Sequence, residues 1–281
     1  MNSLEHVPCP LCRESRHEPW GSENGFTCVR CSGCGLLYVT PRPAAAYIDR
    51  AVQLGVHASE QVEMSVVGRR AGWKVSRFRK SLQGVMPDLG RGRSPVRWLD
   101  VGAGFGEFVE AVRSLAATGS ACEGIEPMVP KAQDAQRRGL PVRAAMMEDV
   151  QEQYDVISLI DVFSHIPDFH AFLRDVKRLL GPRGEILLKT GNAADLGSRS
   201  QFPGPLTLPD HLLFGGERQI RRFLEEAGFQ LIAVRSERMD GVLYSLRNLA
   251  KWLLRKPVCL GLPYTSPART LWVHARLRDS T

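Results

Sequence analysis

The sequence, 281 residues long, predicts an α/β fold with a doubly wound sheet, preceded by a small cysteine-rich module. One observation is that residues 96–101, a short apolar stretch, run directly into three alternating glycines and then into a helical apolar pattern. A strand, a glycine turn and a helix in this order form the ligand site of doubly wound α/β domains. The other observation is that five of the seven cysteines lie within residues 9–34.

The composition is that of an ordinary globular protein, with 43% hydrophobic and 24% charged residues. The length suffices for one large core and a small appendage. A net charge of +7 permits an acidic partner such as nucleic acid, a phosphorylated sugar or a membrane surface, but does not require one. The first residues lack the apolar run of a signal peptide, and no apolar stretch is long enough to span a bilayer. We therefore expect a cytoplasmic protein whose cysteines bind metal or stay reduced.

The cysteines form two C-x-x-C pairs separated by eighteen residues, a spacing typical of four-cysteine zinc sites. The predicted ligands are Cys9, Cys12, Cys31 and Cys34. Cys28 has the same spacing from Cys31, but we prefer Cys34, because Gly33 and Gly35 give the chain the freedom that a tight knuckle needs. Cys28 is then a packing residue. Four protein ligands close the coordination shell, so the zinc (Zn²⁺) is expected to be structural. The alternative is a set of reduced thiols.

Residues 44–95 are expected to form a helical connector, with helices over residues 44–48 and 66–82 and a loop over residues 87–95. The second helix is rich in basic residues: Arg69, Arg70, Lys74, Arg77, Arg79 and Lys80. We interpret them as the solvated face of a helix that packs through Val67, Trp73 and Phe78. The alternative is a lid that contacts an acidic substrate or RNA.

The glycine turn holds the most informative residues. Gly102, Gly104 and Gly106 can adopt positive φ and let the backbone lie directly against a ligand. A dinucleotide fingerprint would need glycine at position 107, which is Glu107. Asp100 precedes the turn, where it would repel a pyrophosphate but suit a ligand with an ammonium group. S-adenosylmethionine (SAM) carries both an amino group and a sulfonium.

The next strand, residues 121–126, ends in Glu126, 26 residues after Asp100. Doubly wound folds place an acid that binds ribose hydroxyls at about this position. Pro127 suits the first turn of the following helix, and Gly139 suits its end. Residues 142–145 are expected to form the third strand, and Met146 and Met147 follow it. These two side chains either contact the adenine ring of the ligand or are ordinary core residues.

The fourth strand spans residues 154–161, and His165 follows its carboxyl end, where open α/β sheets place their sites. Asp168 is expected to cap a helix over residues 169–180, which leads to a fifth strand at 185–189. Residues 191–216 form a long irregular segment that contains His211 and is expected to be functional. A helix over 217–227, a strand over 229–234, a basic amphipathic helix over 242–254 and a final antiparallel strand over 271–277 complete the chain.

Several stretches resemble one known family, the class I SAM-dependent methyltransferases with an N-terminal zinc ribbon. The similar segments follow in order: Cys-x-x-Cys-Gly-Leu-x-Tyr-x-x-Pro-Arg-Pro from Cys31, the glycine turn, Glu126-Pro127, Asp161-x-x-x-His165, Gly-Pro-x-Gly from Gly181, and Asp210-His211-Leu212. Bacterial members often act on sugars and secondary metabolites. The resemblance implies a Rossmann-like sheet of seven strands, with a zinc ribbon at 1–43, a connector or lid at 44–95 and a SAM-binding domain at 96–281. The cofactor-binding candidates are Asp100, Gly102, Ala103, Gly104, Gly106, Glu126, Pro127, Met146, Met147 and Asp161.

The predicted function is methyl transfer from SAM to a small-molecule acceptor, with a sugar or secondary-metabolite hydroxyl preferred. His165 is the first candidate for a general base, because an imidazole titrates near neutrality, and His211 is the second. Two alternatives stay open: an rRNA or tRNA methyltransferase with a zinc ribbon, and a SAM- and zinc-binding module without catalysis. The sequence leaves the acceptor, the methylated atom and the oligomeric state undetermined.

Overall fold

A central sheet of seven strands organises the chain in the computed structural model, which describes residues 4–58, 63–90, 94–202, 204–239, 242–254 and 266–278. The strands lie in the order β10 (Val142–Ala144), β9 (Ala121–Glu126), β8 (Arg97–Val101), β11 (Tyr154–Ile160), β12 (Leu180–Gly191), β15 (Arg269–Leu277) and β14 (Phe229–Arg238). The first five are parallel, and β15 is antiparallel to both of its neighbours. The doubly wound seven-stranded sheet and its antiparallel last strand are therefore confirmed.

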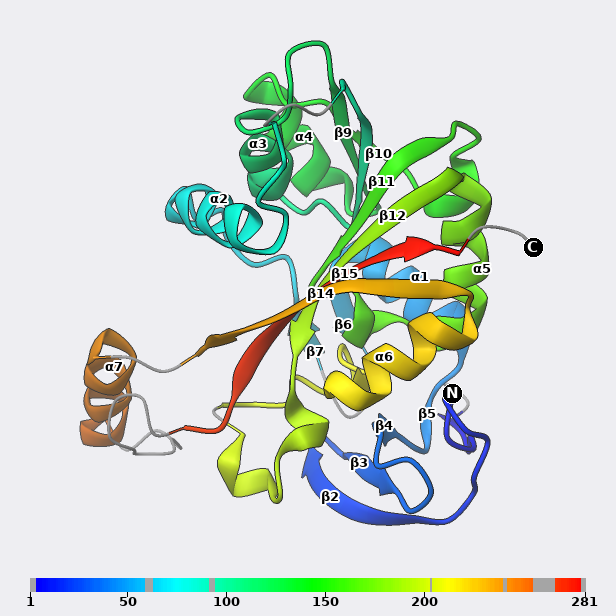
Figure 1. Cartoon of the computed structure of the whole chain (residues 1–281). Coiled ribbons are helices and arrows are strands. Elements are labelled where there is room, and N and C mark those ends of the chain that lie inside the picture. The colour runs from blue at the N-terminus through cyan, green and yellow to red at the C-terminus, as the bar shows by residue number, and fades with distance from the viewer. Residues whose placement is uncertain are drawn as a thin grey trace.

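Helices cover both faces of this sheet, because alternate side chains of its strands point to opposite sides. Trp98 faces α2 (Trp73–Val85) and α3 (Glu107–Arg113), whereas Leu99 faces α5 (Phe169–Leu179) and α6 (Glu217–Glu226). α4 (Val129–Arg137) packs beside α3 and β10. Figure 1 shows the two helical layers, with α7 (Val242–Leu253) beyond the end of the sheet rather than over its face.

Two helix termini test the capping predictions. The Asp168 carboxylate accepts a hydrogen bond from the Ala171 N–H at 3.0 Å, so the predicted cap of α5 is confirmed. Pro127 was expected in the first turn of α4, and that expectation is wrong. The Glu126 carboxylate accepts the Met128 N–H at 3.0 Å, the helix begins only at Val129, and Pro130 takes the place in the first turn. Gly139 has a φ of 75°, as a residue that ends a helix should.

The connector differs most from its prediction. It contains α1 (Ala45–Leu54), a hairpin of β6 (Val56–Ala58) and β7 (Glu63–Ser65), and α2. Residues 66–72 are not helical, because the backbone is held elsewhere: the Val66 N–H donates to Gly55 O, and the Ala71 N–H donates to the Glu107 carboxylate. Trp73 is 63% exposed, so the expectation that it packs against the core is wrong. Phe78 does pack, edge-on against Phe108.

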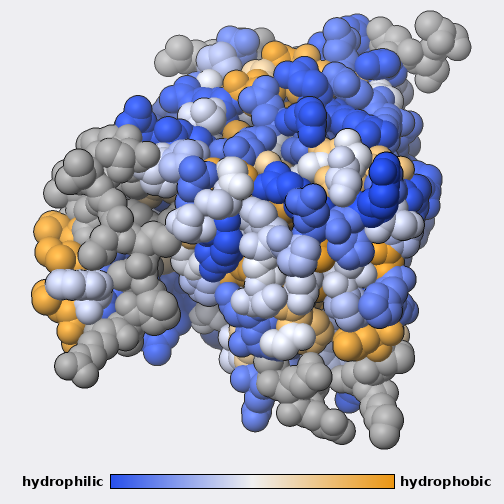
Figure 2. Space-filling view, turned by 90° about the horizontal axis from the view of Figure 1, so that it is seen from below, coloured by the Kyte–Doolittle hydropathy of each residue, from blue (hydrophilic) through white to orange (hydrophobic). Residues whose placement is uncertain are grey.

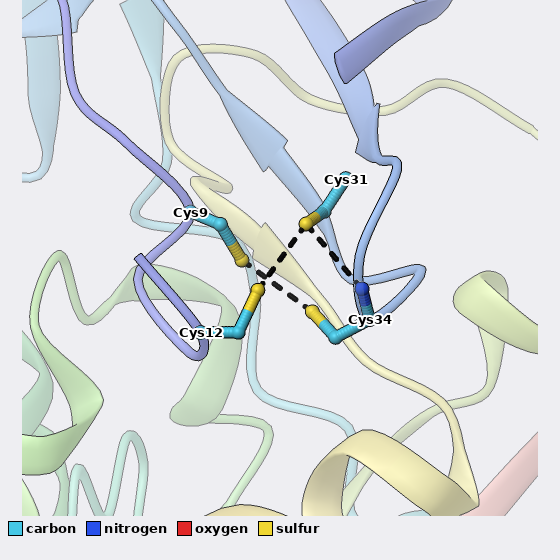
Figure 3. A group of neighbouring side chains, drawn as sticks. All are labelled: Cys9, Cys12, Cys31 and Cys34. Atoms are coloured by element: carbon cyan, nitrogen blue, oxygen red, sulfur yellow. Dashed lines mark hydrogen bonds between the residues drawn. The ribbon is translucent and has the colours of Figure 1, made fainter. Parts of the chain in front are cut away.

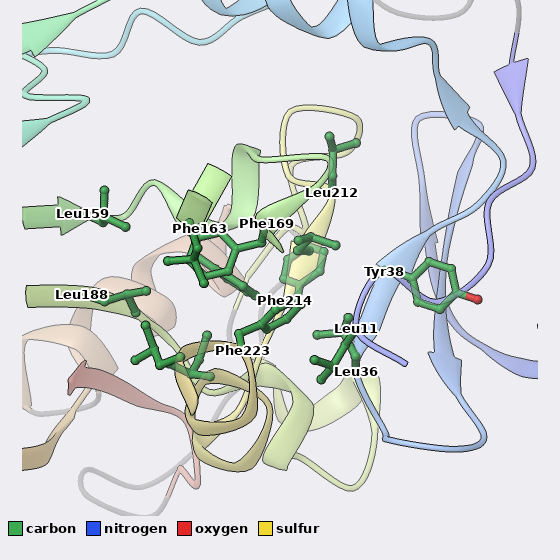
Figure 4. Close-up of a cluster of buried hydrophobic side chains, with 14 of the residues drawn as sticks. Leu11, Leu36, Tyr38, Leu159, Phe163, Phe169, Leu188, Leu212, Phe214 and Phe223 are labelled. Carbon is green, nitrogen blue, oxygen red and sulfur yellow. The ribbon is translucent and has the colours of Figure 1, made fainter. Parts of the chain in front are cut away.

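The N-terminal module is a four-stranded sheet that takes its last strand from a distant part of the chain. The order is β13 (Leu213–Phe214), β4 (Leu37–Val39), β3 (Phe26–Cys31) and β2 (His17–Glu23). A short pair, β1 (Leu4–Glu5) and β5 (Arg42–Pro43), completes the module. Figure 4 shows Leu11 and Leu36 of this module beside Phe214, in a core continuous with that of the large sheet. The ribbon is therefore joined to the α/β core by both hydrogen bonds and apolar packing.

Candidate active site

The glycine turn lies where the strand order of the sheet reverses. β8 is followed along the chain by β9 on one side, whereas β11 lies on its other side. In doubly wound sheets the crevice at the carboxyl ends of such strands is the ligand site. Gly102, Gly104 and Gly106 have φ values of 71°, 56° and 79°, so the predicted positive φ of this turn is confirmed. α3 begins at Glu107, directly after the turn, and its first N–H groups face it.

The three glycines serve different purposes. A Cβ on Gly102 would approach Val162 to 2.7 Å, and one on Gly106 would approach Leu140 to 2.9 Å, so these two permit close packing. A Cβ on Gly104 would meet nothing within 4 Å. Gly104 thus faces open space at the turn, where a ligand can lie against its backbone. Because Val162 lies against Gly102, the loop that carries His165 packs against the glycine turn.

Glu126 also faces the glycine turn. It is buried at the end of β9, and its carboxylate accepts the N–H groups of Gly104 at 2.8 Å and Met128 at 3.0 Å. These bonds fix the carboxylate beside the open position at Gly104. The backbone N–H groups of Gly102 and Ala103 both donate to Ile125 O, so the turn is attached to β9 at several points. The two acidic strand ends, Asp100 and Glu126, therefore flank one turn, as the sequence predicts.

Asp100 is 1% exposed, so its carboxyl is buried beneath the surface of the sheet and not in the open space at Gly104. Its carboxylate accepts a hydrogen bond from the Ser158 hydroxyl at 2.6 Å, and Ser158 in turn accepts one from the Trp98 indole N–H at 2.9 Å. Burial, opposed by the Ser158 hydrogen bond and assisted by the charge of Glu126, raises the pKa of Asp100 to about 8. A cation placed near the turn would favour the charged form of this carboxyl.

The remaining cofactor candidates lie around the same edge. Met147 is buried in the main core, whereas Met146 is half-buried and its N–H donates to the Asp149 carboxylate. Asp161 follows β11 with a φ of 61°, a conformation that costs energy in a residue other than glycine. Its exposed carboxylate forms an ion pair with Lys189 of β12. The adenine and cofactor roles of these residues stay predictions.

His165 and His211, expected separately from the sequence, lie together. Their ring centroids are 4.8 Å apart, and Asp210, which directly precedes His211, contacts the His165 ring. The Nδ1 atom of His165 is 3.0 Å from the carbonyl oxygen of Asp210 and 3.4 Å from its Oδ1. The Nε2 atom of His57, from the connector hairpin, is 3.1 Å from the same Oδ1. The Asp210 carboxylate is therefore in contact with the imidazoles of both His57 and His165.

The electrostatics of this cluster distinguish the two candidate bases. Burial works to lower the pKa of His165, but the hydrogen bond and charge of Asp210 outweigh it, so the pKa is raised. Burial, with repulsion from His165, lowers the pKa of His211 to about 4. Burial works to raise the pKa of Asp210, but the hydrogen bonds of His165 and His57 outweigh it and hold that pKa below the usual range. Asp210 therefore stays ionised, and His165 is the more basic imidazole.

His165, Asp210 and His211 could together bind a cation. One ligand atom each from His165, Asp210 and His211 lies within 4.8 Å of the others. Two imidazoles and a carboxylate suit several divalent metals. In the structure, however, Asp210 is engaged by the hydrogen bonds of His57 and His165, which explain the arrangement without an ion.

The four predicted zinc ligands converge, as Figure 3 shows. The Sγ atoms of Cys9 and Cys34 are 3.5 Å apart, those of Cys12 and Cys31 are 3.4 Å apart, and one sulfur from each residue lies within 4.8 Å of all others. A tetrahedral site with Zn–S distances of about 2.3 Å places its sulfurs ~3.8 Å apart. The donor set therefore fits a structural Zn²⁺. Cys28 lies outside the group, and burial raises the pKa of its thiol to about 12.

The N-terminal cysteine module also positions the Asp210 loop. β13 begins two residues after His211 and pairs with β4, and Val39 N–H donates to Leu212 O at 3.0 Å. On the other side of the loop, the Glu23 carboxylate accepts the N–H groups of Leu206 and Thr207 at 2.7 and 2.8 Å. The ribbon thus holds the segment 206–214 at both of its ends. No local motif in the sequence indicates that the ribbon contributes to the site.

Comparison with known proteins agrees with this geometry. The chain matches the methyltransferase domain family over residues 74–234, more than half of its length, and belongs to that family. The expected enzyme class is therefore confirmed: the protein is a SAM-dependent methyltransferase.

Curated relatives match a shorter part of the chain. The ubiquinone biosynthesis O-methyltransferase of Pseudomonas entomophila is 29% identical over 102 residues, which are 34% of this chain and 44% of that protein. The protein of the same name from Salmonella enteritidis is 31% identical over 102 residues, 34% of this chain and 42% of that protein. The chain spans less than half the length of these relatives.

One solved structure shares the fold. The PH0226 protein of Pyrococcus horikoshii superposes with a TM-score of 0.51 at 11% identity, covering 73% of this chain and 90% of that one. A SAM-dependent methyltransferase from Mesorhizobium loti has a TM-score of 0.49 at 17% identity, covering 70% of this chain and 96% of that one.

Proposed function

We propose that the enzyme methylates a hydroxyl group of a small molecule, with a sugar or secondary metabolite as the preferred acceptor class, and that His165 is its general base. The observation that carries the proposal is the His165–Asp210 pair, on a loop whose Val162 lies against Gly102 of the glycine turn. An imidazole whose basicity is raised by a carboxylate suits removal of a hydroxyl proton. The O-methyltransferase names of the matched relatives support the choice of oxygen as the methylated atom.

In this proposal SAM lies across the turn, with its amino-acid end toward Asp100 and its ribose at Glu126. SAM supplies an electrophilic methyl on a positive sulfur. The acceptor oxygen forms a bond to the methyl carbon while the carbon–sulfur bond breaks, and His165 takes the hydroxyl proton. Asp210 keeps Nδ1 of His165 engaged, so Nε2 is the nitrogen left to accept that proton. The protein otherwise acts by holding the two reactants in line.

The direct test is incubation with methyl-labelled SAM and a panel of acceptors, read by mass spectrometry. The panel contains hydroxylated sugars, phenolic metabolites and quinol-type rings, beside tRNA and rRNA. We expect label on a small-molecule oxygen. Label on RNA alone would favour the RNA-methylating alternative, and SAM binding without transfer to any acceptor would favour the non-catalytic one.

Glu126→Ala is expected to weaken SAM and S-adenosylhomocysteine binding by about 1–3 kcal/mol, because ribose hydroxyls would be left without their acceptor. Calorimetry measures the effect. Since Glu126 also binds the Gly104 N–H, Glu126→Gln serves as a matched variant that keeps an acceptor there. Glu225→Ala, a change at an exposed carboxylate on α6, is the control and should leave SAM affinity unchanged. Unchanged affinity in Glu126→Ala, or preferential binding of NAD by the wild type, would contradict the assignment.

Asp100→Asn is expected to stabilise the ligand-free protein at pH 8 while weakening SAM binding by about 1.5–3 kcal/mol. The unfolded carboxyl titrates near 4 and the folded one near 8. Between these values the folded state binds the extra proton, so the Asp100 contribution destabilises the fold progressively as pH rises. The stability gain of the variant should shrink toward pH 4. Thermal denaturation across pH measures it, and a variant less stable than wild type at pH 8 would refute the account.

A further inference from the structure

His57 is a buried polar residue to which the proposed reaction assigns no part. Hydrophilic residues predominate on the face of the molecule in Figure 2, but His57 is only 1% exposed. Burying a polar group costs free energy unless hydrogen bonds replace its water. The Nε2 atom of His57 lies 3.1 Å from Asp210 Oδ1, whereas its Nδ1 atom has no hydrogen-bond partner among the described residues. The contact with Asp210 is therefore the polar interaction that this imidazole makes.

The direction of this hydrogen bond follows from the charge of its acceptor. Asp210 stays ionised, and an ionised carboxylate has no proton to donate. The Nε2–H group of His57 is therefore the donor, and Oδ1 is the acceptor. The same Oδ1 lies 3.4 Å from Nδ1 of His165. One oxygen atom consequently contacts both a connector histidine and the proposed general base.

Contacts that do not involve Asp210 fix the place of His57. The antiparallel pair of β6 and β7 holds its backbone. At Gly55, next to this hairpin, the connector packs so closely against Met128 that a Cβ would approach the Met128 sulfur to 2.7 Å. The ring centroid of Tyr47, on α1, lies 5.9 Å from that of the imidazole. The donor therefore belongs to a segment that is held in place and can orient a neighbouring carboxylate.

The side chain of Asp210 needs such an anchor, although its backbone does not. The loop backbone is held without His57, because the Leu212 N–H donates to Ser164 O at 2.6 Å. Rotation of an aspartate carboxylate about its Cβ–Cγ bond is soft, so the backbone alone leaves the direction of Oδ1 open. A donor at Oδ1 removes that freedom and keeps the oxygen toward His165.

We propose that His57 is a positioning residue of the methyl-transfer reaction, which holds the Asp210 carboxylate toward His165. The inference rests on the proposed function, in which His165 takes the proton of the acceptor hydroxyl. His57 touches neither reactant in this scheme and acts through Asp210. A misplacement of about 1 Å can slow a reaction on the order of 100-fold, so the orientation of the carboxylate matters to the rate. The connector thereby contributes a residue to the active site.

Two variants separate the hydrogen bond of His57 from its packing. His57→Phe keeps a flat ring beside Tyr47 but has no donor, whereas His57→Gln keeps an N–H near the place of Nε2. The rate is that of labelled-methyl transfer from SAM to the hydroxylated panel compound that carries most label. We expect His57→Phe to lower the single-turnover rate about tenfold or more, with SAM affinity and the KM of that compound within about twofold of wild type.

His57→Gln should recover most of the lost rate. A role in packing alone predicts the reverse order, because Phe fills the site better than Gln, and that result would overturn the proposal. His170→Phe is the matched control, since Nε2 of His170 lies 3.5 Å from another carboxylate, that of Glu226, and joins α5 to α6. It should keep the wild-type rate.

A double-mutant cycle shows whether His57 acts through Asp210. His57→Phe should add little to the loss caused by Asp210→Ala, because without the carboxylate His57 has nothing to orient. Losses that multiply as independent effects would overturn the proposal. Long-range proton–nitrogen NMR spectra of protein labelled at its histidines need no turnover. They should show the His57 proton on Nε2, and a proton on Nδ1 alone would contradict the proposal.

His165→Ala separates this inference from the proposed function. Near-normal turnover in His165→Ala would refute the general base and, with it, the role of His57. A large loss in His165→Ala beside a normal rate in His57→Phe would refute the role of His57 alone.

Discussion

Cys31→Ser is expected to abolish zinc binding and to lower kcat on the order of tenfold or more while leaving SAM affinity nearly unchanged. A structural four-cysteine site that loses one thiolate loses most of its metal affinity, and the folding of such modules depends on the metal. β4 pairs with β13 and Glu23 binds the 206–207 backbone, so loosening the ribbon displaces the loop that carries Asp210 and His211. The glycine turn belongs to the large sheet and should keep its shape.

Metal analysis, calorimetry with SAM and turnover measured on one preparation test this prediction. Cys28→Ser is the matched control, because its buried thiol lies outside the cluster, and it should retain about one zinc per chain. A Cys28→Ser protein without zinc, or a Cys34→Ser protein with it, would show that the second pair was chosen wrongly. Zinc-free protein with normal turnover would show that the ribbon does not position the loop. A second equivalent of metal lost in His211→Ala would assign a cation to the histidine cluster.

The features that the sequence predicted correctly are local ones. The strand, the three glycines and the start of α3 follow from neighbouring residues, since apolar runs and positive-φ requirements act within one turn of chain. The convergence of Cys9, Cys12, Cys31 and Cys34 agrees with the predicted C-x-x-C pairs, and their binding of zinc stays a prediction. The cap at Asp168 needs only a carboxylate three residues before an N–H. For the turn and the cap, the deciding interaction spans few residues, and each cysteine pair is likewise a local motif.

The features that were missed depend on contacts between distant segments. His57 and Asp210 are separated by 153 positions, and only the folding of the connector hairpin against the Asp210 loop brings them together. Ser158 appears in the sequence as one more residue of an apolar strand, yet it pairs with Asp100 across neighbouring strands. The late start of α2 has the same origin, because the Ala71 N–H is taken by Glu107. Tertiary partners overrode local propensity at these positions.

His165→Ala is expected to lower kcat by about 10²–10⁴-fold, the usual contribution of a positioned general base, without changing SAM affinity. Its ring is 30% exposed at the loop that borders the glycine turn, so the deletion should leave the core intact. Single-turnover methyl transfer and calorimetry separate the two effects. Near-normal turnover would point to His211, to Asp161 or to a reaction that needs no base.

The pH profile identifies the base independently of any loss in rate. A base must be deprotonated to act, and the pKa of His165 is raised above 6.5, so kcat should climb with a midpoint above that value. If His211 were the base, activity would persist down to about pH 4.

Asp210→Asn removes the charge that raises the pKa of His165, so the midpoint of the kcat profile should move to lower pH. The plateau of kcat should fall about tenfold or more, because a weaker base accelerates proton transfer less. A merely structural role for Asp210 would lower the plateau without moving the midpoint. His211→Gln should leave the midpoint in place, and the opposite pattern in the two variants would reassign the base to His211.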